Sequence, residues 1–187
     1  MQMSGFFYWE YSKTADCLML CSDSTHRKIR TALKSEMLNR SIINRCDCEM
    51  EDFQFYNQVM ELIEDCDLIP EQQLEFIAHS AVAVKRFLLP SQPKSWFFDF
   101  ADDYNPASFE QLPCLVQAQV KQNQQNISLL LLNSDGNTAD CLLLEPEFNL
   151  PGLQLQFGQP LRIFKNRLQL STLNVDQFDQ SWQQKSA

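Results

Sequence analysis

The residue types most often used in catalysis and metal binding are scarce and poorly spaced in this chain. His26 and His79 are the two histidines that a cysteine nucleophile could use as a base, and His79 lies in an apolar stretch, where it reads as the polar edge of a helix. Cys46 and Cys48 form a C-x-C pair, and no C-x-x-C occurs. A zinc site needs paired short spacings of this kind with matching histidines. The sequence therefore predicts neither a nucleophilic pair nor a metal site.

The sequence also disfavours general acid–base catalysis and phosphate binding by a glycine-rich loop. Asp102 and Asp103 could act as a general acid and base, but a polar loop before Pro106 favours a solvated turn. The chain has four glycines and none are clustered, whereas phosphate-cradling loops need several glycines close together. We expect a protein that is not an enzyme and that has no cofactor.

A binding surface is the remaining option, and it is suggested where two prolines interrupt the chain. Pro90 and Pro93 end the preceding pattern, because proline lacks an N–H and restricts its neighbour to extended geometry. Lys94 and the aromatic run 96–98 follow at once. If residues 96–100 form a strand, Phe97 points away from its two neighbours. The aromatics either fill the interface between two domains or line a cleft with Lys94 and Arg86 on its rim.

Before the prolines, the pattern predicts strands followed by helices. Residues 6–11 and 16–22 read as a hairpin with a short polar link. Residues 27–38 fit a strand or a helix, and we favour a strand that pairs with the hairpin and then turns. A helix is predicted over residues 51–65, and a second opens at Pro70 and ends before Pro90. The apolar stripe predicted for the first helix is Phe53, Tyr56, Met60 and Ile63.

After the prolines, the apolar residues come in short runs separated by turns. Asp135-Gly136 is a strong hairpin signal between two of them. Many short strands of this kind indicate an antiparallel barrel or sandwich. Strands are predicted over residues 96–100, 115–121, 126–133, 138–145, 153–157, 161–164 and 168–173. The fold class is therefore α+β, with an N-terminal α/β domain over residues 1–90, a C-terminal antiparallel β-barrel over residues 91–180 and a frayed tail over residues 181–187.

Charge is segregated along the 187 residues, which carry a formal net charge of −9. Basic residues dominate between His26 and Arg45, where Glu36 is the one acid, and residues 47–67 contain acids but no Lys or Arg. The two stretches could pair within the fold, or the basic one could meet an acidic partner. The acidic balance and the lack of aromatics among the basic residues argue against nucleic acid.

The cysteines and the hydropathy of the chain predict where in the cell the protein is found. The seven cysteines are odd in number and irregularly spaced, as expected for reduced thiols. No run reaches the roughly 20 apolar residues that span a bilayer, and residues 1–5 lack the basic start of a signal peptide. We expect a soluble cytoplasmic protein that is not inserted in a membrane.

Several motifs between residues 8 and 178 resemble those of one known family and occur in the same order along the chain. The most specific is Pro93-Lys94-Ser95-Trp96-x-Phe98. The others are Ala81-Val82-Ala83, Tyr11 with Leu18-Met19-Leu20, Cys141-Leu142-Leu143-x-x-Pro146, Asn166-Arg167-Leu168 and Asn174-Val175-Asp176-x-Phe178. Together they resemble the ZapC family of Z-ring-associated cell division proteins.

The resemblance implies a partner and a location. It implies a cytoplasmic, non-enzymatic protein at the mid-cell division site that binds polymers of FtsZ, the tubulin-like GTPase of the division ring. Such a protein promotes lateral association of FtsZ protofilaments and suppresses the GTPase. The implied fold is an α/β domain joined to a β-barrel, with a pocket between them.

The basic segment and the aromatic run give candidate contacts for that partner on a chain that we expect to be a monomer. An acidic protein that meets acidic filaments needs local basic surface. The candidate partner-binding residues are Leu20, Arg27, Lys28, Arg30, Arg86, Lys94, Trp96 and Phe98. The alternative is a small-molecule-binding protein that uses the interdomain cleft.

Overall fold

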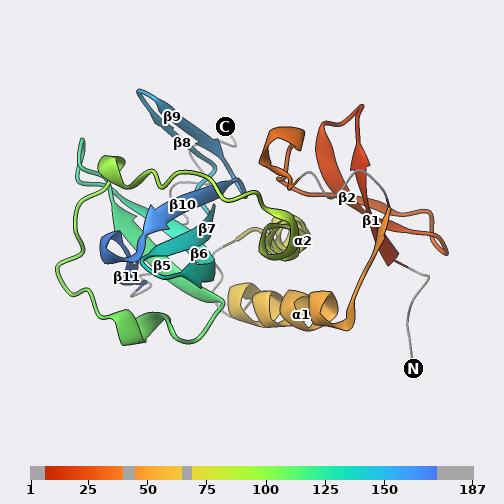
Figure 1. Cartoon of the computed structure of the whole chain (residues 1–187), viewed down its shortest axis with the longest axis horizontal. Coiled ribbons are helices and arrows are strands. Elements are labelled where there is room, and N and C mark those ends of the chain that lie inside the picture. Colours follow the sequence, from red (N-terminus) through yellow and green to blue (C-terminus); the bar gives the residue numbers. More distant parts are fainter. Residues whose placement is uncertain (1–6, 40–44, 65–68, 172–187) are drawn as a thin grey trace.

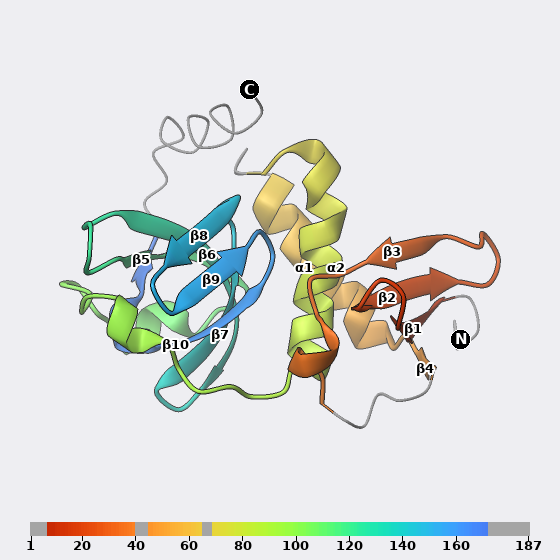
Figure 2. The ribbon, with the colours of Figure 1, turned by 90° about the horizontal axis from the view of Figure 1, so that it is seen from above.

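Two α-helices lie between two antiparallel sheets in the computed structural model, which describes residues 7–39, 45–64 and 69–171 (Figure 1). Helix α2 (Glu71–Phe87) contacts the N-terminal sheet on one side and the C-terminal sheet on the other, while α1 (Met50–Glu64) packs against α2. Figure 2 shows the same order from above, with both helices in the middle. The α+β class is confirmed.

The N-terminal sheet has the strand order β3-β2-β1-β4. Its central hairpin pairs Trp9 with Leu20, which confirms the predicted turn between two strands. The strand favoured within residues 27–38 is also present, followed by a short 3₁₀ helix. The elements are β1 (Phe7–Ser12), β2 (Cys17–Ser22), β3 (Lys28–Arg30), η1 (Ser35–Met37) and β4 (Cys46–Asp47).

Helix α1 buries a different stripe from the predicted one. Asp52, Phe55, Val59 and Ile63 are its buried residues, so only Ile63 was predicted correctly. The buried stripe includes a carboxylate, and periodicity alone does not place a charged residue inside a core. Phe53, Tyr56 and Met60 are half-buried beside it.

Helix α2 is enclosed on nearly all sides in its middle. Ile77, Ala78 and the whole run from Ser80 to Val84 are buried, because sheets cover it from two directions. Pro70 is in the N-cap position, one residue before the helix begins at Glu71, and its side chain makes no capping hydrogen bond. The alanines leave room for this close approach on both sides.

The C-terminal sheet has the strand order β10-β7-β6-β5-β11, and a separate hairpin pairs β8 with β9. Side chains from alternate positions of β6 explain its long apolar run: Leu130 and Leu132 join the core around α2, whereas Leu129 and Leu131 join a second core on the opposite face. The strands are β5 (Cys114–Gln119), β6 (Asn126–Asp135), β7 (Thr138–Leu143), β8 (Glu147–Leu150), β9 (Leu153–Gln156), β10 (Pro160–Phe164) and β11 (Gln169–Leu170).

A closed barrel is not confirmed. Strands β10 and β11 are at opposite edges of the five-stranded sheet, and no pairing joins them within the described residues. The described part of the sheet is therefore open. The barrel stays a prediction.

The strand predicted over residues 96–100 is wrong. Ser95–Phe97 form a 3₁₀ helix, η2, and Phe98 makes a single bridge to Val120. The hydroxyl of Ser95 accepts the backbone N–H of Phe164 at 2.7 Å, and the Lys94 N–H donates to the Arg162 carbonyl at 2.8 Å. These bonds hold the segment against the edge of β10 and prevent an extended ladder.

The predicted domain boundary lies between residues 90 and 91, and one core crosses it. The cluster around α2 includes Trp9 and Leu20 from the first half and Leu130 and Leu142 from the second. The two halves are therefore packed through a shared apolar core. The division into residues 1–90 and 91–180 stays a prediction, and residues 181–187 lie outside the described part.

Candidate functional site

An apolar pocket of 230 Å³ lies between the N-terminal sheet and the two helices. Leu20 and Ile29 face it from paired positions of β2 and β3, and Val82 faces it from α2. Aromatic side chains form much of the remaining wall. They are Phe7 and Trp9 of β1 and Phe53 and Tyr56 of α1.

The pocket has a small polar rim. The Arg27 guanidinium, just before β3, and the Glu75 carboxylate of α2 form an ion pair of 2.6 Å between exposed side chains. His79 stacks on Tyr56 with ring centroids 4.5 Å apart. Burial, with a smaller contribution from Arg27, lowers the pKa of His79 from 6.5 to about 4. The imidazole is therefore neutral at pH 7.

Asp52, one of the residues that line this pocket, belongs to a largely buried ion pair. The Asp52 carboxylate accepts the indole N–H of Trp9 at 3.2 Å and forms an ion pair with Arg86. Arg86 also donates to the carbonyl of Asp47 at 3.1 Å and to the Cys46 thiol at 3.2 Å. Its side chain is 18% exposed. Arg86 thus ties α2 to α1 and β4 and does not lie on the rim of a cleft beside Lys94.

The aromatic residues that follow Pro93 differ in their exposure to solvent. Phe98 is 0% exposed and stacks on Phe148 in the second core, whereas Trp96 is 55% exposed. The Lys94 ammonium lies 5.3 Å from the Trp96 ring centroid. The two interpretations of this run therefore both need correction: Phe98 fills the C-terminal core, and Trp96 faces outward.

Lys28 and Arg30 lie on the outer face of the N-terminal sheet, paired with Cys21 and Met19. Both side chains are exposed. Within the described ranges, the basic stretch pairs with the acidic residues 47–67 only through Arg45 and Asp47, at 3.9 Å. The alternative in which the two stretches pair within the fold is therefore realised only at this contact in the part of the chain that the structure describes.

Leu20 and Arg27 are the candidate residues that the structure brings to the pocket, and the other six lie elsewhere. Tyr56 and His79 were missed as site residues, because their stacking depends on how helix α1 packs against helix α2, which the sequence pattern does not show. Tyr56 and Phe53 belong to the stripe that was predicted to be core. The sequence did contain a signal for this pocket, because the aromatic stripe with Phe53 and Tyr56 accompanies an aromatic-rich predicted strand at residues 6–11.

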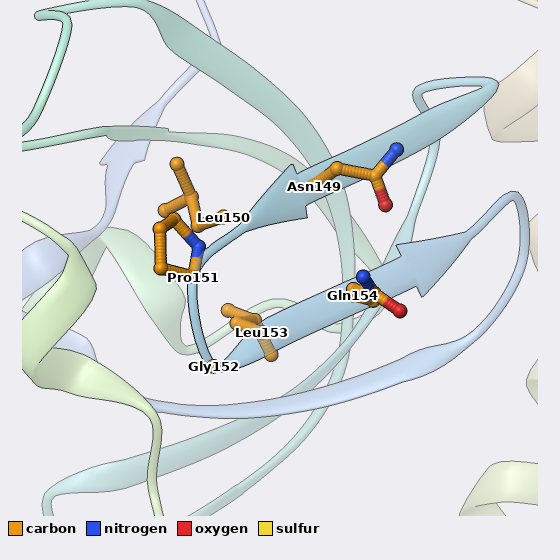
Figure 3. A pocket seen from close by; sticks show the side chains of 6 residues that line it. All are labelled: Asn149, Leu150, Pro151, Gly152, Leu153 and Gln154. Carbon is orange, nitrogen blue, oxygen red and sulfur yellow. The ribbon is translucent and has the colours of Figure 1, made fainter.

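A further hollow carries few chemically reactive side chains. It measures 490 Å³ and lies along the β8–β9 hairpin, where Asn149 faces Gln154 across the strands and Leu150 faces Leu153 at the turn (Figure 3). No titratable side chain lines it. Among the residues described here, no three His, Cys, Asp or Glu side chains are grouped to hold a metal ion.

In the three described ranges, no helix combines the length and the apolar character needed to cross a membrane.

The fold and the pocket define an α+β protein in which two helices between antiparallel sheets enclose an apolar pocket. Residues 90–174 match the family model described as "Cell-division protein ZapC, C-terminal". The Cell division protein ZapC of Vibrio vulnificus is 30% identical over 171 residues, covering 90% of this chain and 91% of the relative. Those of Proteus mirabilis (27%, 74% of both chains) and Musicola paradisiaca (25%, 86% and 85%) are also similar. The chain belongs to the ZapC family of cell division proteins.

Proposed function

We propose that this chain binds FtsZ polymers, promotes lateral contacts between their protofilaments and suppresses their GTPase. It acts in the cytoplasm at mid-cell, as a monomer that is not itself an enzyme. The observation that carries the proposal is an apolar, aromatic-walled pocket of 230 Å³ in a member of a cell division family. Such a pocket receives an apolar anchor of a partner, which is the usual centre of a protein interface.

The pocket chemistry supports a peptide-like partner. Its wall is aromatic and aliphatic, and its polar rim is the exposed Arg27–Glu75 ion pair. Exposed ion pairs contribute about 0–1 kcal/mol, so a partner carboxylate can take the place of Glu75 on Arg27 at small cost. An apolar side chain followed by an acidic residue would satisfy both parts of the site.

A second contact is needed to join two protofilaments. Trp96 and Lys94 offer one on the C-terminal half, because tryptophan is enriched among the residues that dominate binding energy and this indole is half-exposed with the Lys94 ammonium beside it. Two separate contacts on one monomer would bridge two filaments without self-association. The exposed Lys28 and Arg30 would reduce the repulsion between this acidic chain and an acidic filament.

Co-sedimentation with FtsZ polymerised by GTP tests the proposal. We expect the chain to enter the pellet and the pelleted FtsZ to increase, while phosphate release falls. Phe53→Ala, which shortens one pocket wall, should weaken pelleting. The matched control is Leu170→Ala, an exposed leucine on the C-terminal sheet, with circular dichroism to confirm that both variants fold. A chain that stays in the supernatant with unchanged FtsZ sedimentation would refute the proposal.

A further inference from the structure

A second pocket of 280 Å³ lies between the two halves of the molecule. One wall comes from the β1–β2 turn and the segment after β3, and the opposite wall comes from the loop between β9 and β10. Phe76 of α2 also lines it. The volume is near the lower end of the ~300–1,000 Å³ typical of ligand pockets, so the occupant must be small.

The first wall presents positive charge. Arg30 and Lys34 line it, and neither forms an ion pair with a carboxylate within the described part of the chain. Within the described residues, the Arg30 guanidinium makes one long hydrogen bond, of 3.4 Å, to the Ala15 carbonyl. Both cations therefore keep donors available for a ligand.

Asp16 is the acid on this wall, and it is already satisfied. Its carboxylate accepts the Tyr11 hydroxyl at 2.5 Å and the Ser35 backbone N–H at 3.3 Å. The hydrogen bond from Tyr11, followed by those from Ser35, lowers the pKa of the Asp16 carboxyl below its usual value. The positive charge of Lys34 also contributes to the lowered pKa, so Asp16 offsets part of the charge of Lys34, whereas no ion pair joins Asp16 to Arg30 or Lys34 in the described residues.

The opposite wall adds an amide donor. Gln159 is only 9% exposed, and its amide oxygen accepts the Gln156 backbone N–H at 3.0 Å. Its amide nitrogen has no hydrogen-bond partner among the residues that the structure describes. Phe76 and Phe157 stack beside it, with ring centroids 5.9 Å apart and an interplanar angle of 25°. Donors on both walls and an aromatic pair between them favour an acceptor-rich ligand with an apolar part.

We propose that this interdomain pocket binds a small organic molecule that carries a carboxylate or a phosphate. Arg30 and Lys34 hold the anionic group, the Gln159 amide donates from the opposite wall, and the Phe76–Phe157 pair contacts the apolar part. The ligand touches both halves of the chain and so ties them together. This pocket is a different site from the apolar pocket proposed for the filament, although Arg30 is a candidate residue for both functions.

Calorimetric titration of the purified full-length chain tests the proposal. The probes are inorganic phosphate, adenosine monophosphate and succinate, with uncharged adenosine as the control ligand. The phosphate and succinate arms distinguish the two kinds of anion. We expect saturable binding of at least one anionic probe and weaker or no binding of adenosine.

Matched variants locate the site. Arg30→Ala and Lys34→Ala should each raise the dissociation constant about tenfold, which corresponds to one charge-assisted hydrogen bond. Arg30→Lys should retain most of the affinity, and Lys121→Ala, which removes an exposed cation between β5 and β6, should leave it unchanged. Binding of none of the three anionic probes overturns the proposal, as does binding that Arg30→Ala and Lys34→Ala leave intact. Because the titration contains no second protein, its outcome is independent of co-sedimentation with FtsZ.

Discussion

Gly158 lies against the ring of Phe76 so closely that a Cβ on the glycine would be 2.6 Å from the Cε1 atom of the phenylalanine. Gly158 is in the loop between β9 and β10, and Phe76 is on α2. The glycine also has a φ of +76°, which disfavours residues with a Cβ. The contact brings the C-terminal half against the central helix at a position where only glycine fits.

Gly158→Ala should therefore destabilise the fold more than Gly136→Ala. Gly136 has a φ of +54° but open space around its Cα, so its replacement should cost about 1–2 kcal/mol for the left-handed backbone alone. Gly158→Ala adds an overpacking cost of about 1–3 kcal/mol. Urea denaturation gives both free energies of unfolding. Equal losses in the two variants would contradict the close contact with Phe76.

Arg86→Met should cost about 3 kcal/mol or more, because it leaves the Asp52 carboxylate buried without its charged partner. Asp52→Asn in the same chain should recover part of the loss, since a neutral amide needs no counter-charge and can still accept from Trp9. Arg27→Met breaks an exposed ion pair and should change the free energy of unfolding by about 1 kcal/mol or less. Thermal and urea unfolding of the three variants measure these differences. Similar losses in Arg86→Met and Arg27→Met would show that the Asp52 pair is not structurally important.

His79 should make the fold sensitive to mild acid. Its pKa is about 4 in the folded chain and 6.5 as a free side chain, so the unfolded chain takes up a proton first as pH falls. Above pH 6.5 the free energy of unfolding is not reduced by this difference in pKa. As pH falls from about 6.5 to about 4 the free energy of unfolding decreases progressively, by about 2–3 kcal/mol at pH 4.5. His79→Phe retains a ring on Tyr56 but cannot titrate. The free energy of unfolding should therefore fall less between pH 7.5 and pH 4.5 in this variant, and an equal fall would rule out His79 as the source.

Trp96→Ala and Phe98→Ala should separate partner binding from stability. Phe98 is fully buried, and its removal should cost about 3–5 kcal/mol. Trp96 is 55% exposed, so its removal should leave the free energy of unfolding nearly unchanged while weakening co-sedimentation with FtsZ. Lys94→Asp should also weaken co-sedimentation with an unchanged circular dichroism spectrum. A folded Trp96→Ala variant that pellets normally would remove this surface from the proposed interface.

Local patterns predicted the elements well where one short-range signal dominated. The polar link between residues 11 and 16 gave the first hairpin, and Pro90 marked the end of α2. Asp135-Gly136 gave the hairpin between β6 and β7. The strand at residues 96–100 failed because bonds from Ser95 and Lys94 to β10, which is distant in sequence, override a local run of aromatics.

The candidate site was predicted only in part, because it is assembled from five elements. Leu20 and Arg27 were chosen from the sequence, but the stacking of Tyr56 on His79 depends on how α1 packs on α2. Arg86 was expected at a cleft and instead compensates a buried carboxylate on α1. Charge pairing of this kind cannot be deduced from spacing along the chain.

By itself, the amino-acid sequence determined the α+β class, most of the strands, both helices and the family, since these depend on periodicity, turn residues and short motifs. The tertiary structure alone decided which side of each element is buried, and so separated exposed Trp96 from buried Phe98. It also placed Gly158 on Phe76 and Arg30 opposite Gln159. The physical reason is that burial and pocket formation arise from packing between elements that are far apart in the chain, whereas helices, strands and turns arise from neighbours within a few residues.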